Sequence, residues 1–247
     1  MIRIAAVGDV HVGVDSVGTL RPALTQLRDC ADVLLLAGDL TRLGREEELR
    51  VLLDELDGIG VPCVAVLGNH DYESDQAEAL TKLLVDADVT VLEGTNVVID
   101  TGEFRLGIAG SKGFGGGFAG ACASDFGEPE MKAFLQPTKR MAAAVGAALD
   151  DLDRQGVDAR VALLHFAPVK DTLGAERLEI FPFLGSYLLG EAIDRAGADL
   201  VIHGHAHHGV EHGVTPSGIP VRNVALPVIR EAFRVYCLGT EPETEKH

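Results

Sequence analysis

Side chains that can bind metal ions follow five separate strand-like segments of this chain. The segments are runs of apolar residues at 2–7, 33–37, 64–67, 161–164 and 200–202. The polar groups that follow these runs are Asp9-Val10-His11, Gly38-Asp39, Gly68-Asn69-His70-Asp71, His165 and His203-Gly204-His205-Ala206-His207. Because ligands of open α/β sheets gather at the carboxyl ends of the strands, five such coincidences indicate one site at that edge.

The candidate ligands supply carboxylate, amide and imidazole groups and no thiolate. Such donors suit manganese, iron or zinc and give copper little support. They are numerous enough to bind two ions. Two ions roughly 3.5–4 Å apart need a bridging carboxylate, and together they can clamp a phosphoryl group while activating a hydroxide. Asp-x-His and Gly-Asp are common by chance, but the ordered set is not. The residues alone therefore indicate a hydrolase with two metal ions.

Each candidate also has an ordinary structural explanation. Asp9 and Asp39 could cap helices at strand-to-helix turns, and His165 could be a buried, hydrogen-bonded histidine. The ordered set of five segments favours metal binding over these alternatives. Four further polar residues are assigned other roles: His203 to a strand, Asp71 to supporting the loop of the neighbouring histidine, and His208 and His212 to the surface.

Composition bounds the class of protein. The chain has 247 residues, of which 47% are hydrophobic and 24% are charged, as is ordinary for one globular domain. No apolar run approaches the roughly 20 residues of a membrane helix, and Asp9 and His11 interrupt the early apolar stretch of a would-be signal peptide. We therefore expect a cytoplasmic protein. The four cysteines are far apart in the sequence, and we expect buried, reduced thiols.

The net charge of −17 disfavours broad nucleic-acid binding, which requires a basic face. It does not exclude a phosphorylated small molecule as substrate, because two bound cations would reverse the sign of the charge locally. Part of the acidity lies in the segment 241–247, which we interpret as a solvated tail after a single domain at 1–240.

Read coarsely, strands and helices alternate in the first half of the chain, which favours a parallel sheet with crossover helices. The expected strands are 2–7, 32–37 and 62–67, and the expected helices lie near 18–29, 45–57 and 75–86. After residue 88 short strands predominate, at 89–92, 96–100, 104–109, 159–164, 199–203, 219–225 and 232–238, with one long helix near 129–153. These are too many strands for a simple doubly wound sheet, so we expect two packed sheets flanked by helices.

Two stretches lack a clear regular pattern. The glycine-rich segment 110–120 is either a loop whose backbone approaches a ligand or a flexible connector, and it offers Lys112 as a possible substrate contact. The segment 167–186 is a long connection directly after His165. Long connections in compact domains are often functional, so we expect a lid or a pocket wall here.

In order and spacing, the five polar segments resemble the calcineurin-like metallophosphoesterase family from Gly8 to His207, which is most of the chain. The resemblance implies an α/β fold, a four-layer αββα sandwich of two mixed sheets flanked by helices, with two metal ions at one edge. It also implies three ligands for each ion and one shared carboxylate. The first ion would be held by Asp9, His11 and His207, the second by Asn69, His165 and His205, and Asp39 would bridge them.

The resemblance implies that catalysis depends on His70, together with Asp39 and Asn69. His70 would lie over the phosphate and either protonate the leaving oxygen or stabilise the transition state, while a metal-activated hydroxide attacks. Many relatives carry a second aspartate three residues after the bridging one, which orients this histidine in the phosphoprotein phosphatases. Here that position is Arg42, which could contact the substrate phosphate or be a solvated arginine.

We therefore predict a phosphoesterase that depends on two divalent or trivalent ions of manganese, iron or zinc. A phosphodiesterase or small-molecule phosphoesterase is favoured over a phosphomonoesterase or protein phosphatase, because the missing aspartate weakens a leaving-group acid. A hypothesis from another class is a non-catalytic metal-binding scaffold for protein recognition. Such a scaffold would be expected to lose ligands, whereas this chain retains the full set.

Overall fold

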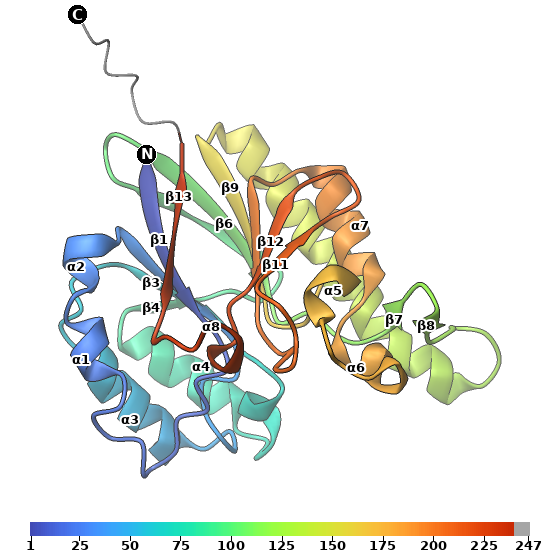
Figure 1. Cartoon of the computed structure of the whole chain (residues 1–247), viewed down its shortest axis with the longest axis horizontal. Coiled ribbons are helices and arrows are strands. Elements are labelled where there is room, and N and C mark those ends of the chain that lie inside the picture. Colours follow the sequence, from blue (N-terminus) through green and yellow to red (C-terminus); the bar gives the residue numbers. More distant parts are fainter. Residues whose placement is uncertain (240–247) are drawn as a thin grey trace, which may run out of the picture.

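Two mixed β-sheets pack face to face in the computed structural model, and helices cover the outer face of each (Figure 1). The structure describes residues 1–239, so the predicted acidic tail lies outside the described residues. The strand order is β13-β1-β2-β3-β4 in the first sheet and β11-β12-β10-β9-β6-β5 in the second. The predicted four-layer αββα sandwich of two mixed sheets is confirmed.

The first sheet is parallel except at one edge, where β13 runs antiparallel to β1. Its strands are β1 (Ile2–Val7), β2 (Val33–Ala37), β3 (Cys63–Val66), β4 (Val89–Val91) and β13 (Arg234–Leu238). Within β2, Leu34 and Leu36 pack against the helices, while Val33 and Leu35 pack toward the second sheet. Because both faces of the strand are covered, its sequence is a continuous apolar run instead of an alternating one.

The second sheet combines four parallel strands with an antiparallel strand at each edge. Its strands are β5 (Thr95–Asp100), β6 (Arg105–Ser111), β9 (Ala159–Leu164), β10 (Leu200–His203), β11 (His212–Val214) and β12 (Pro220–Asn223). Residues of β1, β2 and β3 and residues of β6, β9 and β10 form one buried cluster between the sheets. This cluster fixes the strands of one sheet relative to those of the other, and so fixes where their ends meet.

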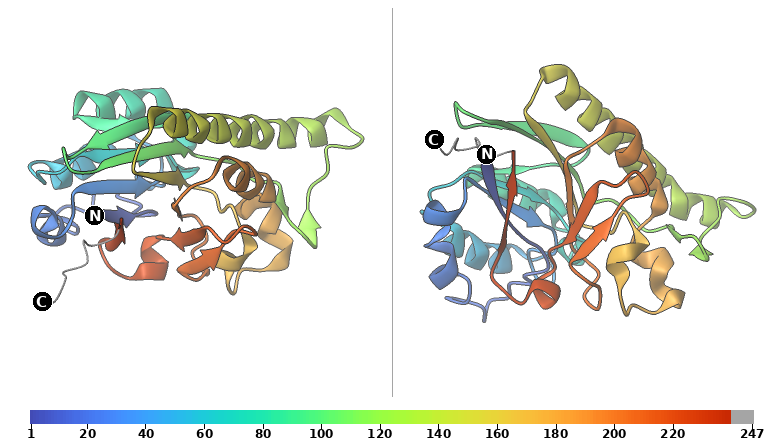
Figure 2. Two further views of the ribbon diagram at one scale, coloured as in Figure 1. Left: turned by 90° about the horizontal axis from the view of Figure 1, so that it is seen from above. Right: turned by 45° about the horizontal axis from the view of Figure 1, so that its top comes forward.

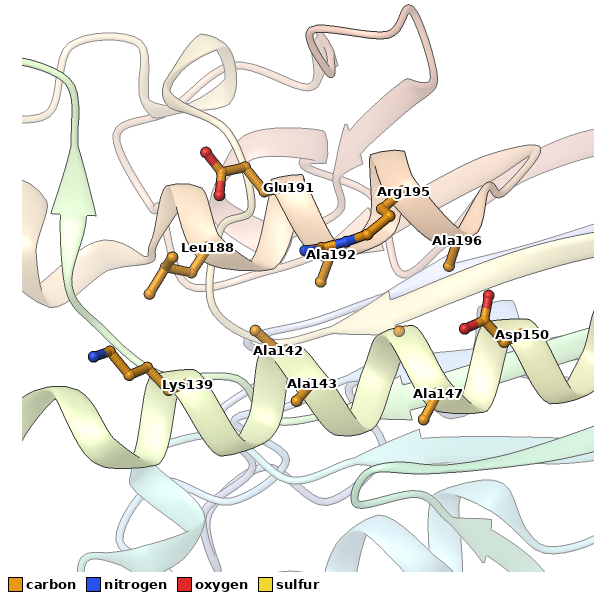
Figure 3. Close-up of a pocket in the computed structure, with 11 residues that line it drawn as sticks. Lys139, Ala142, Ala143, Ala147, Asp150, Leu188, Glu191, Ala192, Arg195 and Ala196 are labelled. Atoms are coloured by element: carbon orange, nitrogen blue, oxygen red, sulfur yellow. The ribbon is translucent and has the colours of Figure 1, made fainter.

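Helices of unequal length form the two outer layers. The first sheet is covered by α1 (Arg21–Leu24), α2 (Leu27–Cys30), α3 (Glu46–Leu56) and α4 (Ala77–Asp86), and the second by α5 (Pro129–Gln155) and α7 (Tyr187–Ala196). Seen from above, α5 extends beyond the edge of the sheets (Figure 2). Alanine side chains of α5 and α7 line a groove of about 370 Å³ between the two helices (Figure 3). None of the predicted site residues lines this groove.

The prediction of one continuous helix near 18–29 is wrong, because two short helices, α1 and α2, form there instead. Pro22 lies in the first turn of α1, where its missing N–H breaks no helical hydrogen bond. A helix that began at residue 18 would place this proline in an interior turn. The two short helices bury Leu24 and Leu27.

The glycine-rich stretch is more regular than predicted. β6 continues to Ser111, and β7 (Gly117–Phe118) pairs with β8 (Ala121–Cys122). At Gly115 a Cβ atom would lie 2.3 Å from the carbonyl oxygen of Pro182, so a larger residue cannot fit there. The bare backbone therefore packs against the connection 167–186 and is not a flexible connector.

The connection 167–186 is ordered into short helices that the sequence pattern did not reveal. These are the 3-10 helices η2 (Lys170–Leu173) and η3 (Leu178–Ile180) and the helix α6 (Phe181–Leu184). The strand expected near 219–225 is also shorter than predicted, because the helix α8 (Leu226–Ile229) begins soon after β12, with a proline in its first turn. The four cysteines are free thiols, but the expectation of burial is wrong for Cys122 and Cys237, which are exposed.

Replacing Leu35 with alanine tests the inter-sheet core. Leu35 is fully buried, so Leu35→Ala should lower the free energy of unfolding by about 2–5 kcal/mol, measured by urea denaturation. Val17 is 73% exposed, so Val17→Ala should change the free energy of unfolding by less than about 0.5 kcal/mol. A loss for Leu35→Ala no larger than that of this control would contradict the position of Leu35 between the sheets.

Candidate metal centre

Loops from both sheets meet where the carboxyl ends of β1, β2, β3, β9 and β10 lie together. Main-chain hydrogen bonds join these loops across the sheet boundary. The N–H of Gly8, which follows β1, donates to the carbonyl oxygen of Val224, which follows β12, and the N–H of Leu226 donates to the carbonyl oxygen of Gly8. Two sheets that are separate along most of their length are thus joined at the predicted site.

Four of the predicted ligands have left-handed backbone conformations, with φ values of 55° at Asp9, 43° at His11, 49° at Asp39 and 69° at His205. This conformation is unfavourable for residues other than glycine, and it concentrates at functional sites. Helix capping does not account for the two aspartates. The carboxylate of Asp9 accepts from the N–H of His205, and that of Asp39 accepts from the N–H of His70, both from distant loops.

One group of donors consists of Asp9, His11, Asp39 and His207, with one ligand atom of each lying within 4.8 Å of all the others. His207 Nε2 lies 2.9 Å from Asp9 Oδ1 and 3.5 Å from His11 Nε2. Two imidazole nitrogens and a carboxylate oxygen that converge at such distances can surround a cation. The residues predicted for the first ion are therefore brought together.

A second group consists of Asp39, His165 and His205, again with ligand atoms within 4.8 Å of one another. Asn69 Oδ1 lies 2.9 Å from His165 Nε2, so the structure places Asn69, the fourth residue predicted for the second ion, next to this group. Asp39 takes part in both groups. Its Oδ1 lies 3.4 Å from His165 Nε2 and its Oδ2 lies 3.7 Å from His11 Nε2, as a bridging carboxylate requires.

Backbone carbonyl groups orient two of the histidine rings. Nδ1 of His165 lies 2.9 Å from the carbonyl oxygen of Ala37, and Nε2 of His205 lies 3.0 Å from that of Phe183. Because a carbonyl oxygen only accepts, each of these nitrogens carries the proton. The other ring nitrogen then has a free lone pair, which is the arrangement that metal-binding histidines use.

Burial keeps most of these histidines neutral. It lowers the pKa of His11 to about 4 and that of His205 to about 3, and it lowers the pKa of His165 well below its ordinary value. Burial raises the pKa of Asp9 to about 6, and the hydrogen bond to Asp9 raises the pKa of His207. Neutral imidazoles beside buried carboxylates are the form in which these groups bind cations, so the residues fit a pair of ions.

His70 lies beside the first group, with its ring centroid 4.5 Å from that of His11. Its Nδ1 donates to the carbonyl oxygen of Arg42 at 2.8 Å. The backbone of residue 42 therefore orients the ring. The guanidinium of Arg42 is partly exposed and pairs with Asp15 at 2.9 Å, as the solvated-arginine interpretation predicts.

Asp71 supports the loop of His70, as predicted. Its buried carboxylate accepts hydrogen bonds from the N–H groups of Gly68, Leu40 and Thr41 and from the Thr41 hydroxyl, and so ties the loop after β3 to the loop after β2. His203 is buried at the end of β10, where Thr172 Oγ1 lies 2.8 Å from its Nε2. His208 and His212 are exposed, so these assignments are confirmed.

Sequence reasoning missed the carbonyl groups of Ala37, Arg42 and Phe183, which orient rings of the site. Backbone carbonyls leave no signal in a sequence, because every residue has one. Only the connection 167–186 offered a hint, since a pocket wall was expected there and Phe183 does contact His205.

Residues 2–209 match the family model described as calcineurin-like phosphoesterase. The chain belongs to this family. Dependence on two metal ions is typical of the family, and the two groups of donors agree with it. Among residues 1–239, no helix has both the length and the apolar character needed to cross a bilayer.

Two curated relatives match part of the chain. A protein of Synechococcus sp. named probable cyclic nucleotide phosphodiesterase is 35% identical over 92 residues, which are 33% of this chain and 34% of that protein. An uncharacterized protein of Methanocaldococcus jannaschii is 35% identical over 100 residues, 39% of this chain and 42% of its own length. The matches therefore cover about a third to two fifths of these relatives.

Solved structures share the fold at low sequence identity. Phosphopantetheinyl hydrolase from Mycobacterium tuberculosis superposes with a TM-score of 0.68 and 18% identity, over 96% of this chain and 98% of that one. The protein TT1561 of Thermus thermophilus superposes with a TM-score of 0.55 and 19% identity, over 90% and 88% of the two chains. These likenesses support the sandwich fold.

Removing the shared carboxylate tests the arrangement of the two groups. Asp39→Ala should bind less than one ion per chain under conditions in which the unaltered protein binds two, because both groups lose a ligand. Elemental analysis after gel filtration measures the ratio. Asp54→Ala removes an exposed carboxylate from α3 and should leave two ions bound. Two ions on Asp39→Ala would contradict the bridging role.

Proposed function

We propose that this chain hydrolyses a phosphate ester with the help of two metal ions, and that its substrate is a phosphodiester or another small phosphoester. The observation that carries the proposal is the position of Asp39, whose two carboxylate oxygens face two separate groups of donors. A site for a single structural ion would not need this shared ligand. Membership of the phosphoesterase family supports the same reaction class.

The residues that would hold the ions are those predicted from the sequence. Asp9, His11 and His207 would bind one ion, Asn69, His165 and His205 the other, with Asp39 between them. Manganese, iron and zinc all suit this donor set. When bound, such ions neutralise phosphoryl charge and lower the pKa of water, which supplies the attacking group.

His70 would transfer a proton or stabilise charge at the substrate. Since Nδ1 donates to the carbonyl oxygen of Arg42, Nε2 is the nitrogen that can face the leaving oxygen. A carbonyl carries a partial negative charge, whereas an aspartate would carry a full one. We infer that proton transfer from His70 contributes less to catalysis than it would beside an aspartate, which suits ester groups that leave readily.

The choice of substrate class follows from this difference and from the relatives. The partly matching Synechococcus protein is named a probable cyclic nucleotide phosphodiesterase, which supports a diester or another small substrate. The net charge of −17 disfavours long nucleic acids. The four free thiols suit a reducing compartment, so we propose that the enzyme works in the cytoplasm.

The competing proposal is a scaffold that recognises another protein and catalyses nothing. A metal-binding scaffold would need the orientation of His165 and His205 as much as an enzyme would, but it places no demand on His70, which is not a predicted ligand. The orientation of His70 by the Arg42 carbonyl therefore favours the enzyme.

Assays with nitrophenyl phosphate and bis-nitrophenyl phosphate test the proposal directly. The purified protein loaded with Mn²⁺ should hydrolyse the diester faster than free Mn²⁺ does, and faster than it hydrolyses the monoester. No turnover above the free-metal background, with two ions confirmed by elemental analysis, would contradict the enzymatic function.

Replacing His70 separates the enzyme from the scaffold. His70→Ala should lower kcat by about 10²- to 10⁴-fold, because it removes the proton donor, and should leave two ions bound. His212→Ala removes an exposed histidine and serves as the matched control. Unchanged turnover in His70→Ala would show that this ring takes no part in the reaction.

A further inference from the structure

Among residues 1–239, Lys112 is the one lysine whose side chain lies among the rings next to the second group of donors. It directly follows β6, and the residue is only 8% exposed. Its main-chain carbonyl accepts from the N–H groups of His165 and Phe166, which fixes it beside a predicted ligand. The long side chain of a lysine normally reaches water, so burial at this position calls for a reason.

Aromatic rings surround the Lys112 ammonium on three sides. Its Nζ lies 4.4 Å from the ring centroid of Tyr72, 5.3 Å from that of Phe114 and 5.7 Å from that of Phe166. Tyr72 follows His70 by two residues, and the ring of Phe166 packs 4.4 Å from that of His205. The ammonium therefore lies between the loop of His70 and the residues that follow β9.

No carboxylate pairs with this ammonium among residues 1–239. Glu93, whose carboxylate bonds to the backbone of Lys112, accepts from the hydroxyl of Ser111 and the main-chain N–H of Lys112. Lys82 and Lys139, by contrast, pair with Asp86 and Asp125 on the surface. A buried cation without an anionic partner is costly, and such groups concentrate at sites where a ligand supplies the missing charge.

Charged groups near the site act on the Lys112 ammonium. Burial lowers its pKa, and the negative charges of Glu93 and Asp39 oppose that shift. The Lys112 carbonyl oxygen accepts from the N–H of His165, and the ammonium lies 5.7 Å from the ring of Phe166, which packs against His205. These contacts place Lys112 beside the second group of donors.

We propose that Lys112 binds an anionic oxygen of the substrate's phosphoryl group beside the second ion. This inference rests on the proposed function. It adds to the two ions a third cationic group, which the chain itself supplies. The three aromatic rings hold the ammonium in place, so little conformational entropy is lost when the phosphate binds. The same rings exclude water, which strengthens the charge-assisted hydrogen bond.

The variant Lys112→Met tests this role, because methionine keeps an unbranched apolar stem among the rings and removes the charge. The Mn²⁺-loaded variant should retain two ions and the unaltered melting temperature. Its kcat/KM for bis-nitrophenyl phosphate should fall about 10- to 100-fold, and its inhibition constant for inorganic phosphate should rise about 10-fold. Lys112→Arg keeps the charge, so its kcat/KM and its inhibition constant for phosphate should lie between those of Lys112→Met and those of the unaltered protein.

The matched control is Lys82→Met, which removes one positive charge from the surface of α4 and should match the unaltered protein. Lys112→Met with kcat/KM and phosphate inhibition within twofold of the unaltered protein would overturn the inference. The inference would also be overturned if Lys112→Arg had a kcat/KM no higher than that of Lys112→Met, or if both variants lost bound metal. Each of these results would indicate a structural role.

Calorimetry with inorganic phosphate separates this inference from the proposed function. If the unaltered protein bound phosphate but turned over no ester, the proposed function would fail and weaker phosphate binding by Lys112→Met would still support the role of Lys112. If the unaltered protein turned over ester and Lys112→Met bound phosphate equally well, only the inference would fail.

Discussion

The buried carboxylate of Asp39 is the group on which the arrangement of this site depends. It lies at the end of β2, in the middle of the first sheet, and its oxygens face histidines that come from both sheets. A buried anion between neutral imidazoles is unfavourable without a positive partner. The geometry of the site therefore makes physical sense as a receptor for cations, and the packing of the two sheets provides the energy that holds the carboxylate there.

Main-chain groups provide most of the precision of the site. Carbonyl oxygens orient His165, His205 and His70, and left-handed residues turn the loops so that Asp9 and His11 point inward. At His70 this carbonyl belongs to the backbone of Arg42, so the ring is oriented without a carboxylate side chain.

Charge is distributed unevenly between the surface and the site. The chain carries a net charge of −17, yet Lys112 places an ammonium among aromatic rings beside the donors. An acidic surface repels polyanions over long distances, whereas a fixed cation and the two proposed ions would attract one phosphate group at short range. The proposed combination would suit small phosphoesters better than nucleic acids.

Much of the fold and the identity of the candidate ligands followed from the sequence. Continuous apolar runs such as 33–37 predicted covered strands, and the polar groups after them predicted a shared edge, because both signals depend on local order along the chain. The break between α1 and α2, the pairing of β7 with β8 and the short helices of 167–186 depended on proline placement and close backbone packing, which periodicity does not register. Only the tertiary structure decided that Asp39 faces both groups and that the Arg42 carbonyl orients His70. It also decided that no described carboxylate pairs with the Lys112 ammonium. These contacts join residues that are distant in sequence, and many of them involve the backbone, so no local pattern could reveal them.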